Sequence, residues 1–572
     1  MGDYMFGKFS RFGKRHAANL AGNNSKNGNS NNNNDSTNSK NKNNINSNNI
    51  NNNNNNNTIN KKDAGDNQKG FYKNKPVNNL MLSNSLEKNI SLFEDIFSGD
   101  ETLIIRRFQN RYLTSVKCCA LYFHGMVNNE IINENIIQPL LSSNLAEGID
   151  TNNLIDELQY KVIICGNVKT SQDFTAIVNS LIGGDTILLL ESCSKALIIS
   201  SKGLEKRSIT EPESAKVIRG PREGFTESII TNISLVRRII NNADLKLKFK
   251  EIGERTHTKT CICYIEGLAL ESVLNELEQR LDKIKIDGIL DSGYIQELIK
   301  DAPFSLFETV GASERPDVIA AKLLEGRVAL FVDGSPFVLT VPYVIAESAQ
   351  ANEDYYNNFI FASMNRVFRT VGTILATSIP SLFLALTTFH HELLPTQLLL
   401  SLSTARKDVP LPSVLSLIIM LTIFDILREA GTRMPSSIGE TINIVGTLVL
   451  GEAAVQAKLV SAPVIIVTAI TGILTLMNKN LILSTVVLRF LFLIASSILG
   501  IYGFTFAFIL LIIHLMSIRS FGVPYMLDIT SIKDHNAQDT WIRAPWWTMT
   551  LRPKIIGMKN RIRQSSGRPW RK

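Results

Sequence analysis

The chain has 572 residues, a formal net charge of +8, a very polar N-terminal segment and a very apolar region from about residue 370 to 518. This length is more than one compact domain requires. The tail at 519–572 has eleven basic and only three acidic residues, so it accounts for the whole net charge; this fits a membrane-proximal segment facing anionic lipid and argues against binding to nucleic acid.

The first segment, residues 1–85, is rich in asparagine, which makes up more than half of residues 19–60. A tract with so few apolar side chains cannot bury enough surface to offset the loss of chain entropy. We therefore expect a disordered leader at 1–85. Residues 1–22 lack the apolar core of a signal peptide.

Alternating strand and helix patterns begin at about residue 84 and indicate a first soluble α/β subdomain at 86–215. The patterns predict helices at 86–97, 130–142 and 171–182, and strands at 118–123, 161–165, 185–190 and 195–200.

A linking helix and a second soluble α/β subdomain are expected at 216–365. The patterns predict helices at 228–240, 268–284 and 317–325, and strands at 245–252, 259–265, 328–332 and 336–341. The sequence Asp333-Gly334-Ser335 between the last two strands predicts a hairpin.

All six cysteines precede the apolar region: Cys118, Cys119, Cys165, Cys193, Cys261 and Cys263. No two of them have CxxC spacing, which argues against a zinc site. We expect reduced thiols in a cytosolic domain, with Cys261 and Cys263 on one face of a strand. The sequence predicts no metal ligand and no cofactor.

The region at 366–518 contains five apolar segments, most of them near the roughly 20 residues that cross a bilayer. These are 371–389, 412–427, 459–477, 481–499 and 501–518, with a break at Gly500 between the last two. A less apolar sixth candidate lies at 437–456. The soluble subdomains and the basic tail at 519–572 are both expected to be cytoplasmic, which requires an even number of crossings. A re-entrant piece between 390 and 410 would change this count.

The predicted fold class is therefore an α+β membrane protein. It has two cytoplasmic α/β subdomains, followed by an α-helical transmembrane domain of about six helices.

The sixth candidate helix carries a stripe of polar and small residues within about 120° of its circumference. They are Ser437, Glu440, Asn443, Thr447, Gly451, Ala454 and Lys458. Such a stripe fits close packing on another helix or the lining of a pore, and the residues leave both interpretations open. A ring of Glu440 side chains in an oligomer would favour cations.

Other charged residues of the apolar region are expected to have partners. Arg489 lies deep enough in its span to need a partner or a cavity. Arg428 is expected to pair with a carboxylate. His390 and His391 suggest metal binding or pH sensing, but adjacent histidines point apart on a helix, which favours packing or interfacial exposure.

Motifs of enzymes are missing from the sequence, which has no GxxxxGK[ST], HExxH or GxSxG. We predict no catalytic residue and expect that the protein is not an enzyme.

Several segments, in the right order, resemble the A subunits of GerA-type spore germinant receptors. They are 225–238 (FTESIITNISLVRR), 311–317 (GASERPD), 324–336 (LEGRVALFVDGSP), 390–395 (HHELLP), 424–431 (FDILREAG) and 446–455 (GTLVLGEAAV). The resemblance covers roughly residues 86 to 530 and leaves out the asparagine-rich leader.

This resemblance implies a subunit in the inner membrane of a dormant bacterial spore, which acts with a permease-like B subunit and a lipoprotein C subunit. It also implies self-assembly into an oligomeric ring that forms a germinant-gated channel for monovalent cations and triggers germination. On this interpretation Glu440, Asn443, Thr447 and Gly451 line the pore, and Val455 forms an apolar constriction. The alternative is a non-conducting receptor or scaffold that relays nutrient binding by contact.

Overall fold

The structure is a computed structural model, and most of the chain from residue 81 onward can be described. The described residues are 71–72, 75–76, 81–113, 116–143, 151–203, 211–212, 216–434, 449, 451–527, 539–553, 556, 560 and 562–563. Most of the predicted leader lies outside them.

A five-stranded sheet forms the centre of the first subdomain. Its strands follow the order β3-β4-β6-β7-β5, and all neighbouring strands are antiparallel. Their bounds are β3 (Leu103–Gln109), β4 (Lys117–Phe123), β5 (Val168–Ser171), β6 (Thr186–Leu190) and β7 (Ala196–Ile199).

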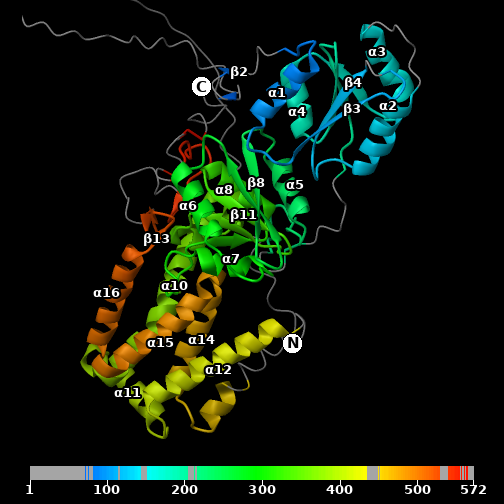
Figure 1. Ribbon diagram of the computed structural model, residues 1–572. Coiled ribbons are helices and arrows are strands. Elements are labelled where there is room, and N and C mark those ends of the chain that lie inside the picture. Colours follow the sequence, from blue (N-terminus) through cyan, green and yellow to red (C-terminus); the bar gives the residue numbers. More distant parts are fainter. Residues whose placement is uncertain are drawn as a thin grey trace, which may run out of the picture. The chain divides into compact units, whose positions relative to one another are not determined.

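Helices cover both faces of this sheet (Figure 1). One face packs against α1 (Leu86–Ile96) and α4 (Phe174–Ile182), and the other against η2 (Ile131–Ile137), α2 (Gln138–Ser142), α3 (Thr151–Glu157) and η3 (Leu158–Val162). Because successive side chains of a strand point to opposite faces, β4 is apolar on both faces from Cys118 to Phe123. Leu121 faces the α1 side and Ala120 the α2 side.

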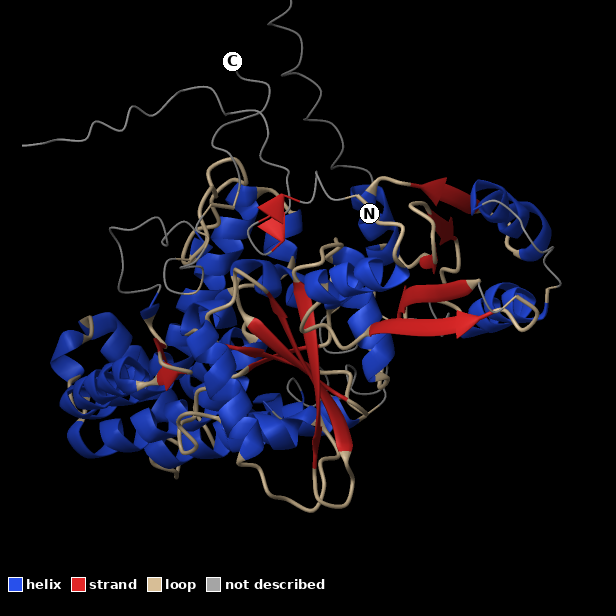
Figure 2. Ribbon diagram, turned by 45° about the horizontal axis from the view of Figure 1, so that its top comes forward, coloured by secondary structure: helices blue, strands red, loops and turns tan. Residues whose placement is uncertain are grey.

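The second subdomain repeats this three-layer arrangement around another antiparallel sheet, in the order β10-β12-β11-β9-β8 (Figure 2). The strands are β8 (Leu245–Ile252), β9 (Thr258–Ile265), β10 (Gly311–Ser313), β11 (Val328–Val332) and β12 (Val338–Val341). Helices α5 (Ile229–Ile239) and α8 (Pro316–Glu325) cover one face, and α6 (Glu271–Asp282) and α7 (Ser292–Ile299) cover the other. The α+β fold class is confirmed for the chain. The α/β class predicted for each subdomain is not, because all neighbouring strands of both sheets are antiparallel.

Two local predictions for the second sheet are confirmed. Cys261 and Cys263 both lie in the core layer beneath α5 and α8. Strands β11 and β12 form an antiparallel pair. The turn between them has Gly334 at φ +84°, a left-handed conformation that glycine adopts without steric cost.

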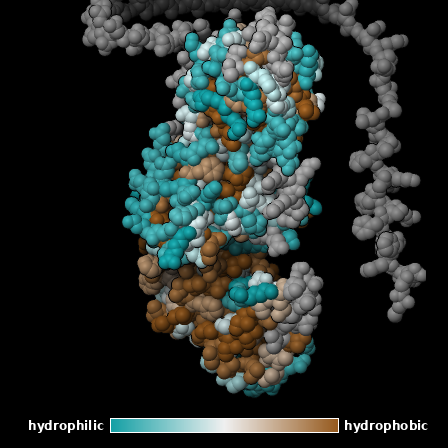
Figure 3. All heavy atoms as spheres, turned by 45° about the vertical axis from the view of Figure 1, so that its right-hand side comes forward, coloured by the Kyte–Doolittle hydropathy of each residue, from teal (hydrophilic) through white to brown (hydrophobic). Residues whose placement is uncertain are grey.

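The remaining helices are mostly apolar, and the space-filling view shows hydrophobic side chains gathered on their surface (Figure 3). They are α10 (Phe359–Thr388), α11 (Thr396–Arg406), α12 (Ser413–Arg433), α14 (Ala462–Leu476), α15 (Ile482–Leu499) and α16 (Ile501–Ser517). The predicted break between α15 and α16 is confirmed at Gly500, where φ is +62°.

Among the described residues, two helical segments are long and apolar enough to cross a membrane, Phe359–Thr388 and Lys479–Leu499. Ala462–Leu476 and Ile501–Ser517 are apolar but shorter. Most of the sixth candidate, at 437–456, lies outside the described residues. The number of six crossings therefore stays a prediction.

Two parts of the first sheet differ from the prediction. The strand predicted at 161–165 is wrong, because residues 158–162 form the π-helical turn η3. Val162 and Ile163 pack into the core beneath the sheet, and such a short apolar run fits a buried helix as well as a strand. The two edge strands, β3 and β5, were not predicted. The half-exposed sequence of β3, LIIRRFQ, lacks a clear alternation of apolar residues.

Candidate functional site

Three charged side chains meet between the apolar helices α12 and α15. Arg489 of α15 donates a hydrogen bond from Nη2 to Oδ2 of Asp425 in α12. Arg428, one turn after Asp425, places its Nη1 3.2 Å from Asp425 Oδ1. The Arg489 side chain is completely buried, whereas Asp425 is 15% and Arg428 18% exposed. The predicted carboxylate partner of Arg428 and the predicted partner of Arg489 are thus the same residue.

This cluster holds more positive than negative charge, because one carboxylate faces two guanidinium groups. Nε and Nη1 of Arg489 are buried and have no hydrogen-bond acceptor among the described residues. The Phe490 ring lies 5.3 Å from the Arg489 guanidinium carbon. Buried charges are costly unless they are paired, and at membrane depth they usually face a partner or a water-filled cavity. The cluster is therefore a fixed source of positive potential within the helical region.

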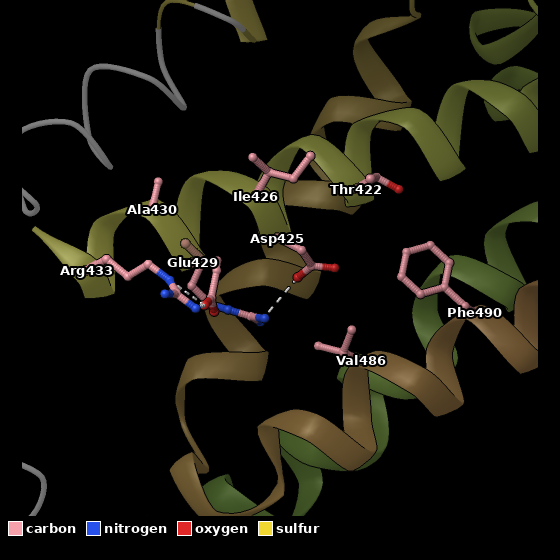
Figure 4. Close-up of a pocket in the computed structure, with 9 residues that line it drawn as sticks. Thr422, Asp425, Ile426, Glu429, Ala430, Arg433, Val486 and Phe490 are labelled. Atoms are coloured by element: carbon pink, nitrogen blue, oxygen red, sulfur yellow. Dashed lines mark hydrogen bonds and ion pairs between the residues drawn. The ribbon is translucent and has the colours of Figure 1, made fainter.

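A pocket of about 580 Å³ opens beside these side chains. It is lined by Thr422, Asp425, Ile426, Arg428, Glu429, Ala430, Arg433, Val486 and Phe490. Figure 4 shows Asp425 and Glu429 on the side of α12 that faces Val486 and Phe490 of α15. Glu429 Oε1 accepts a hydrogen bond of 2.8 Å from Arg433 Nη2. The pocket thus combines an apolar wall with charged groups.

The five predicted pore residues divide into two groups. Glu440, Asn443 and Thr447 lie outside the described residues. Gly451 is buried, and a Cβ atom added there would lie 3.7 Å from Ile465 Cγ2 of α14, an ordinary packing distance. Val455, one turn further on, is 36% exposed. In the single chain, Gly451 therefore faces a neighbouring helix, whereas Val455 reaches the surface.

The helix that contains Gly451 and Val455 forms an ion pair near its end with the segment after α11. Lys458 Nζ lies 2.6 Å from Asp408 Oδ2, and both side chains are mostly exposed. The paired histidines separate, as predicted. The His390 ring packs against Tyr502 with centroids 5.9 Å apart, while His391 is exposed.

A second charged cluster lies where the second subdomain continues into α10. Glu347, 7% exposed, is 2.7 Å from Arg327 Nη1 and 3.0 Å from Lys322 Nζ. Its Oε1 also accepts a hydrogen bond of 2.8 Å from the Val344 N–H. Burial alone would raise the pKa of Glu347, but the two cations and this N–H outweigh it and hold the pKa below its ordinary value.

A third cluster joins the start of α10 to the tail of the chain. Nη1 of the buried Arg366 lies 2.9 Å from Asp539 Oδ1, and its Nε lies 3.3 Å from Asp354 Oδ2. Arg369 also donates to Asp354, and Tyr355 donates a hydrogen bond of 2.9 Å to Asp539. The sequence interpretation missed this cluster. The only indication of this cluster in the sequence was Asp539, one of three acidic residues in a strongly basic tail.

The described residues contain no group of three or more His, Cys, Asp or Glu side chains that could hold a metal ion. Their six cysteines are free thiols, and burial raises the pKa of Cys118 and of Cys119 to about 12. Such thiols are poor nucleophiles at neutral pH, since the thiolate is the reactive form.

A family model and individual relatives of this chain both name spore germination proteins. Residues 91–555 match the family described as Bacillus/Clostridium GerA spore germination protein. The chain is 39% identical over 494 residues to spore germination protein KA of Bacillus subtilis (strain 168), covering 86% of this chain and 90% of the relative. It is 34% identical over 491 residues to spore germination protein B1 of the same organism, covering 85% of this chain and 100% of the relative.

A solved structure is also similar in sequence. It is the crystal structure of the N-terminal domain of the A subunit of the Bacillus megaterium spore germinant receptor GerK3, and it is 34% identical. The match covers 46% of this chain and 96% of that chain, with a TM-score of 0.37.

Proposed function

Because this chain belongs to the GerA family of spore germination proteins, we propose that it is the A subunit of a nutrient germinant receptor in the spore inner membrane. In this proposal several copies form a ring, and the ring is a germinant-gated channel for monovalent cations. Opening of the channel triggers germination.

The observation that carries the family assignment is a match over residues 91–555, which includes the soluble subdomains and the apolar helices. The two helical segments long enough to cross a membrane support a membrane location. The two relatives described above are named spore germination proteins, which supports a receptor subunit rather than an enzyme.

The proposed organisation follows the boundaries expected from the sequence. Residues 1–85 are a leader, 86–215 and 216–365 are cytoplasmic, 366–518 cross the membrane about six times, and the basic tail at 519–572 returns to the cytoplasmic side. The proposed partners are a permease-like B subunit and a lipoprotein C subunit.

The proposed pore follows the polar stripe of the helix at 437–458, with Glu440, Asn443, Thr447 and Gly451 along it and Val455 as its apolar constriction. Two features support this placement. An ionisable residue such as Glu440 at membrane depth usually faces water or a partner. The exposure of Val455 in the single chain leaves its side chain available at the axis of a ring.

The test measures cation flux through the full chain reconstituted in a planar bilayer with its B and C partners and a germinant. E440Q is expected to reduce cation selectivity and V455A to increase leak, because these changes remove a charge and a constriction from the proposed pore. E452Q is the matched control, since Glu452 lies beside the stripe and is exposed. Wild-type conduction with no change in E440Q, V455A or a T447V variant would contradict the pore assignment.

The second candidate function is a non-conducting receptor or scaffold that relays germinant binding by contact. The packing of Gly451 against Ile465 of α14 favours it, because a small residue at a helix interface allows close approach. The same bilayer measurement decides between the two. Absence of current under every partner condition supports the scaffold and excludes the channel.

A further inference from the structure

All four tryptophans of the chain lie in its last part, at positions 541, 546, 547 and 570. Among those described, Trp541 is 40% and Trp546 41% exposed, and the neighbouring Ile542 is 59% exposed. Tryptophan is enriched at the boundary between hydrocarbon and water, where its ring sits at the level of the lipid headgroups.

Hydrogen bonds and ring packing hold this segment beside the first turns of α10. The Arg543 N–H donates a hydrogen bond of 3.0 Å to Ser363 Oγ, and Ser363 Oγ in turn donates to the Arg543 carbonyl at 3.1 Å. The Trp547 ring meets the Phe359 ring edge-on with centroids 5.9 Å apart. With the Asp539–Arg366 contact at 2.9 Å, residues 539–547 follow α10 over its first two turns.

These turns lie outside the hydrocarbon layer if the helix crosses a membrane. The 30 residues of α10 span about 45 Å at 1.5 Å per residue, whereas the hydrocarbon core is about 30 Å thick. Arg366 and Arg369 occupy the N-terminal part of the helix and are paired with acidic groups. Such pairs belong at the membrane boundary rather than within it.

The same turns nevertheless present a strongly apolar surface. Ile360, Phe361, Met364, Val367 and Phe368 are each between 39% and 66% exposed. The stripe continues without a break along the helix through Val371, Ile374 and Leu375, which are also exposed. An apolar face continuous with the lipid-facing part of a helix is suited to the zone where acyl chains meet headgroups.

Arg552 and Arg563 give this segment positive charge, and the carboxylates of Glu325 and Asp539 lie within electrostatic range of Arg563. Residues 540–563 contain no acidic residue. Arg552 donates to the carbonyls of Leu324 and Ile562 and to Asn560. The guanidinium of Arg563 lies 5.3 Å from the centre of the Trp546 ring. Burial and the proximity of Arg563 lower the pKa of Arg552, as expected for two cations held close together.

We propose that the described residues of the tail at 539–553 and 562–563, with the first turns of α10, form a seat for the headgroup layer of an anionic phospholipid leaflet. Trp541 and Ile542 enter the boundary between headgroups and acyl chains, and Arg563 faces the lipid phosphates. Binding of lipid at the seat sets the distance between the second subdomain and the membrane surface. This inference rests on the membrane location in the proposed function but does not require conduction.

The absence of tryptophan elsewhere in the chain provides a specific test. The full chain is reconstituted in phosphatidylglycerol vesicles as a W546F/W547F/W570F variant, which retains Trp541, and as a matched W541F/W546F/W570F variant, which retains Trp547. Lipids brominated near the carboxyl end of the acyl chain quench tryptophan that reaches this depth. We expect Trp541 to lose about half of its emission, as an interfacial residue should, and Trp547, which packs on Phe359, to lose clearly less.

Quenching of Trp541 by aqueous iodide but not by brominated lipid would overturn the proposal, because the ring would then face water. Protection of Trp541 from both quenchers would overturn it in favour of a second copy or a partner subunit on this surface. R563Q is expected to reduce the difference in Trp541 quenching between phosphatidylglycerol and phosphatidylcholine vesicles, and an unchanged difference would exclude the phosphate contact. Cation flux measured in the same vesicles distinguishes this proposal from the proposed channel. Quenching of Trp541 by brominated lipid without cation flux would support the lipid contact and contradict only the channel.

Discussion

Arg237 Nη2 lies 2.6 Å from Asp100 Oδ2, although the two residues are 137 positions apart in the chain. Both side chains are buried, at 1% and 0% exposed. Asp100 precedes the first sheet, and Arg237 belongs to α5, which packs on the second sheet. Asp100 also forms a parallel bridge with Leu247 of β8. This ion pair therefore connects the two sheet-containing subdomains.

Removing one partner of the Arg237–Asp100 pair is expected to lower the stability of the folded chain strongly. In D100N, Arg237 keeps its charge in a buried site without a counter-ion, a situation that costs roughly 3–5 kcal/mol. We expect the unfolding temperature of the purified full chain to fall and hydrogen exchange to increase in α5. The matched control is E87Q, which removes an exposed pair with Arg107 at 3.4 Å and should have an effect below about 1 kcal/mol. Equal effects of the two changes would contradict this assignment.

The Arg489–Asp425 pair predicts a similar dependence among the apolar helices. D425N removes the only carboxylate that contacts both Arg489 and Arg428 among the described residues, so we expect a lower unfolding temperature in detergent, equivalent to roughly 3–5 kcal/mol. D408N is the control, because Asp408 pairs with Lys458 at a site where both are at least 60% exposed. The exchanged variant D425R/R489D should recover part of the loss. A D425N protein as stable as D408N would show that the pair does not support the helices.

The Glu347 cluster predicts a specific dependence of stability on pH. The pKa of Glu347 in the folded chain lies below its ordinary value, so the stabilisation is complete above the unfolded pKa of about 4.5 and is lost as the pH falls through the folded pKa. We expect E347Q to be less stable than wild type at pH 7. The difference between the two should shrink as the pH falls below 4.5 and protonates Glu347 in the wild type. A difference that is constant from pH 7 to 3 would exclude the ion pairs with Arg327 and Lys322 as its cause.

The cysteines predict an order of chemical labelling. Five are buried and Cys165 is partly exposed. Burial raises the pKa of Cys118 and of Cys119 to about 12 and also raises the pKa of Cys165, so all three thiols react slowly at pH 8, but access favours Cys165. Mass spectrometry after iodoacetamide treatment of the folded chain should find Cys165 modified first and the others only after unfolding. Early labelling in a C165S variant would contradict the buried positions.

Much of the architecture could be predicted from the sequence because it depends on local patterns. Amphipathic spacing identified α5, α6 and α8, and Gly334 and Gly500 marked turns that require a left-handed backbone. The failure at 161–165 has a local cause as well, since four apolar residues in a row fit a buried helical turn and a strand equally well. The antiparallel order of both sheets was not predictable, because each strand can pair with several others of similar composition.

The sequence by itself therefore determined that strands and helices alternate before the apolar region, and it determined the apolar helices, the basic tail and the family, since each depends on composition, periodicity or contiguous motifs. Only the tertiary structure decided which charges meet. Asp100 joins Arg237 across 137 positions, Asp425 joins Arg489 across 64, and Asp539 joins Arg366 across 173. The physical reason is that a buried charge takes as its partner whichever opposite charge the packing brings near, and packing depends on contacts between segments that are distant in the chain.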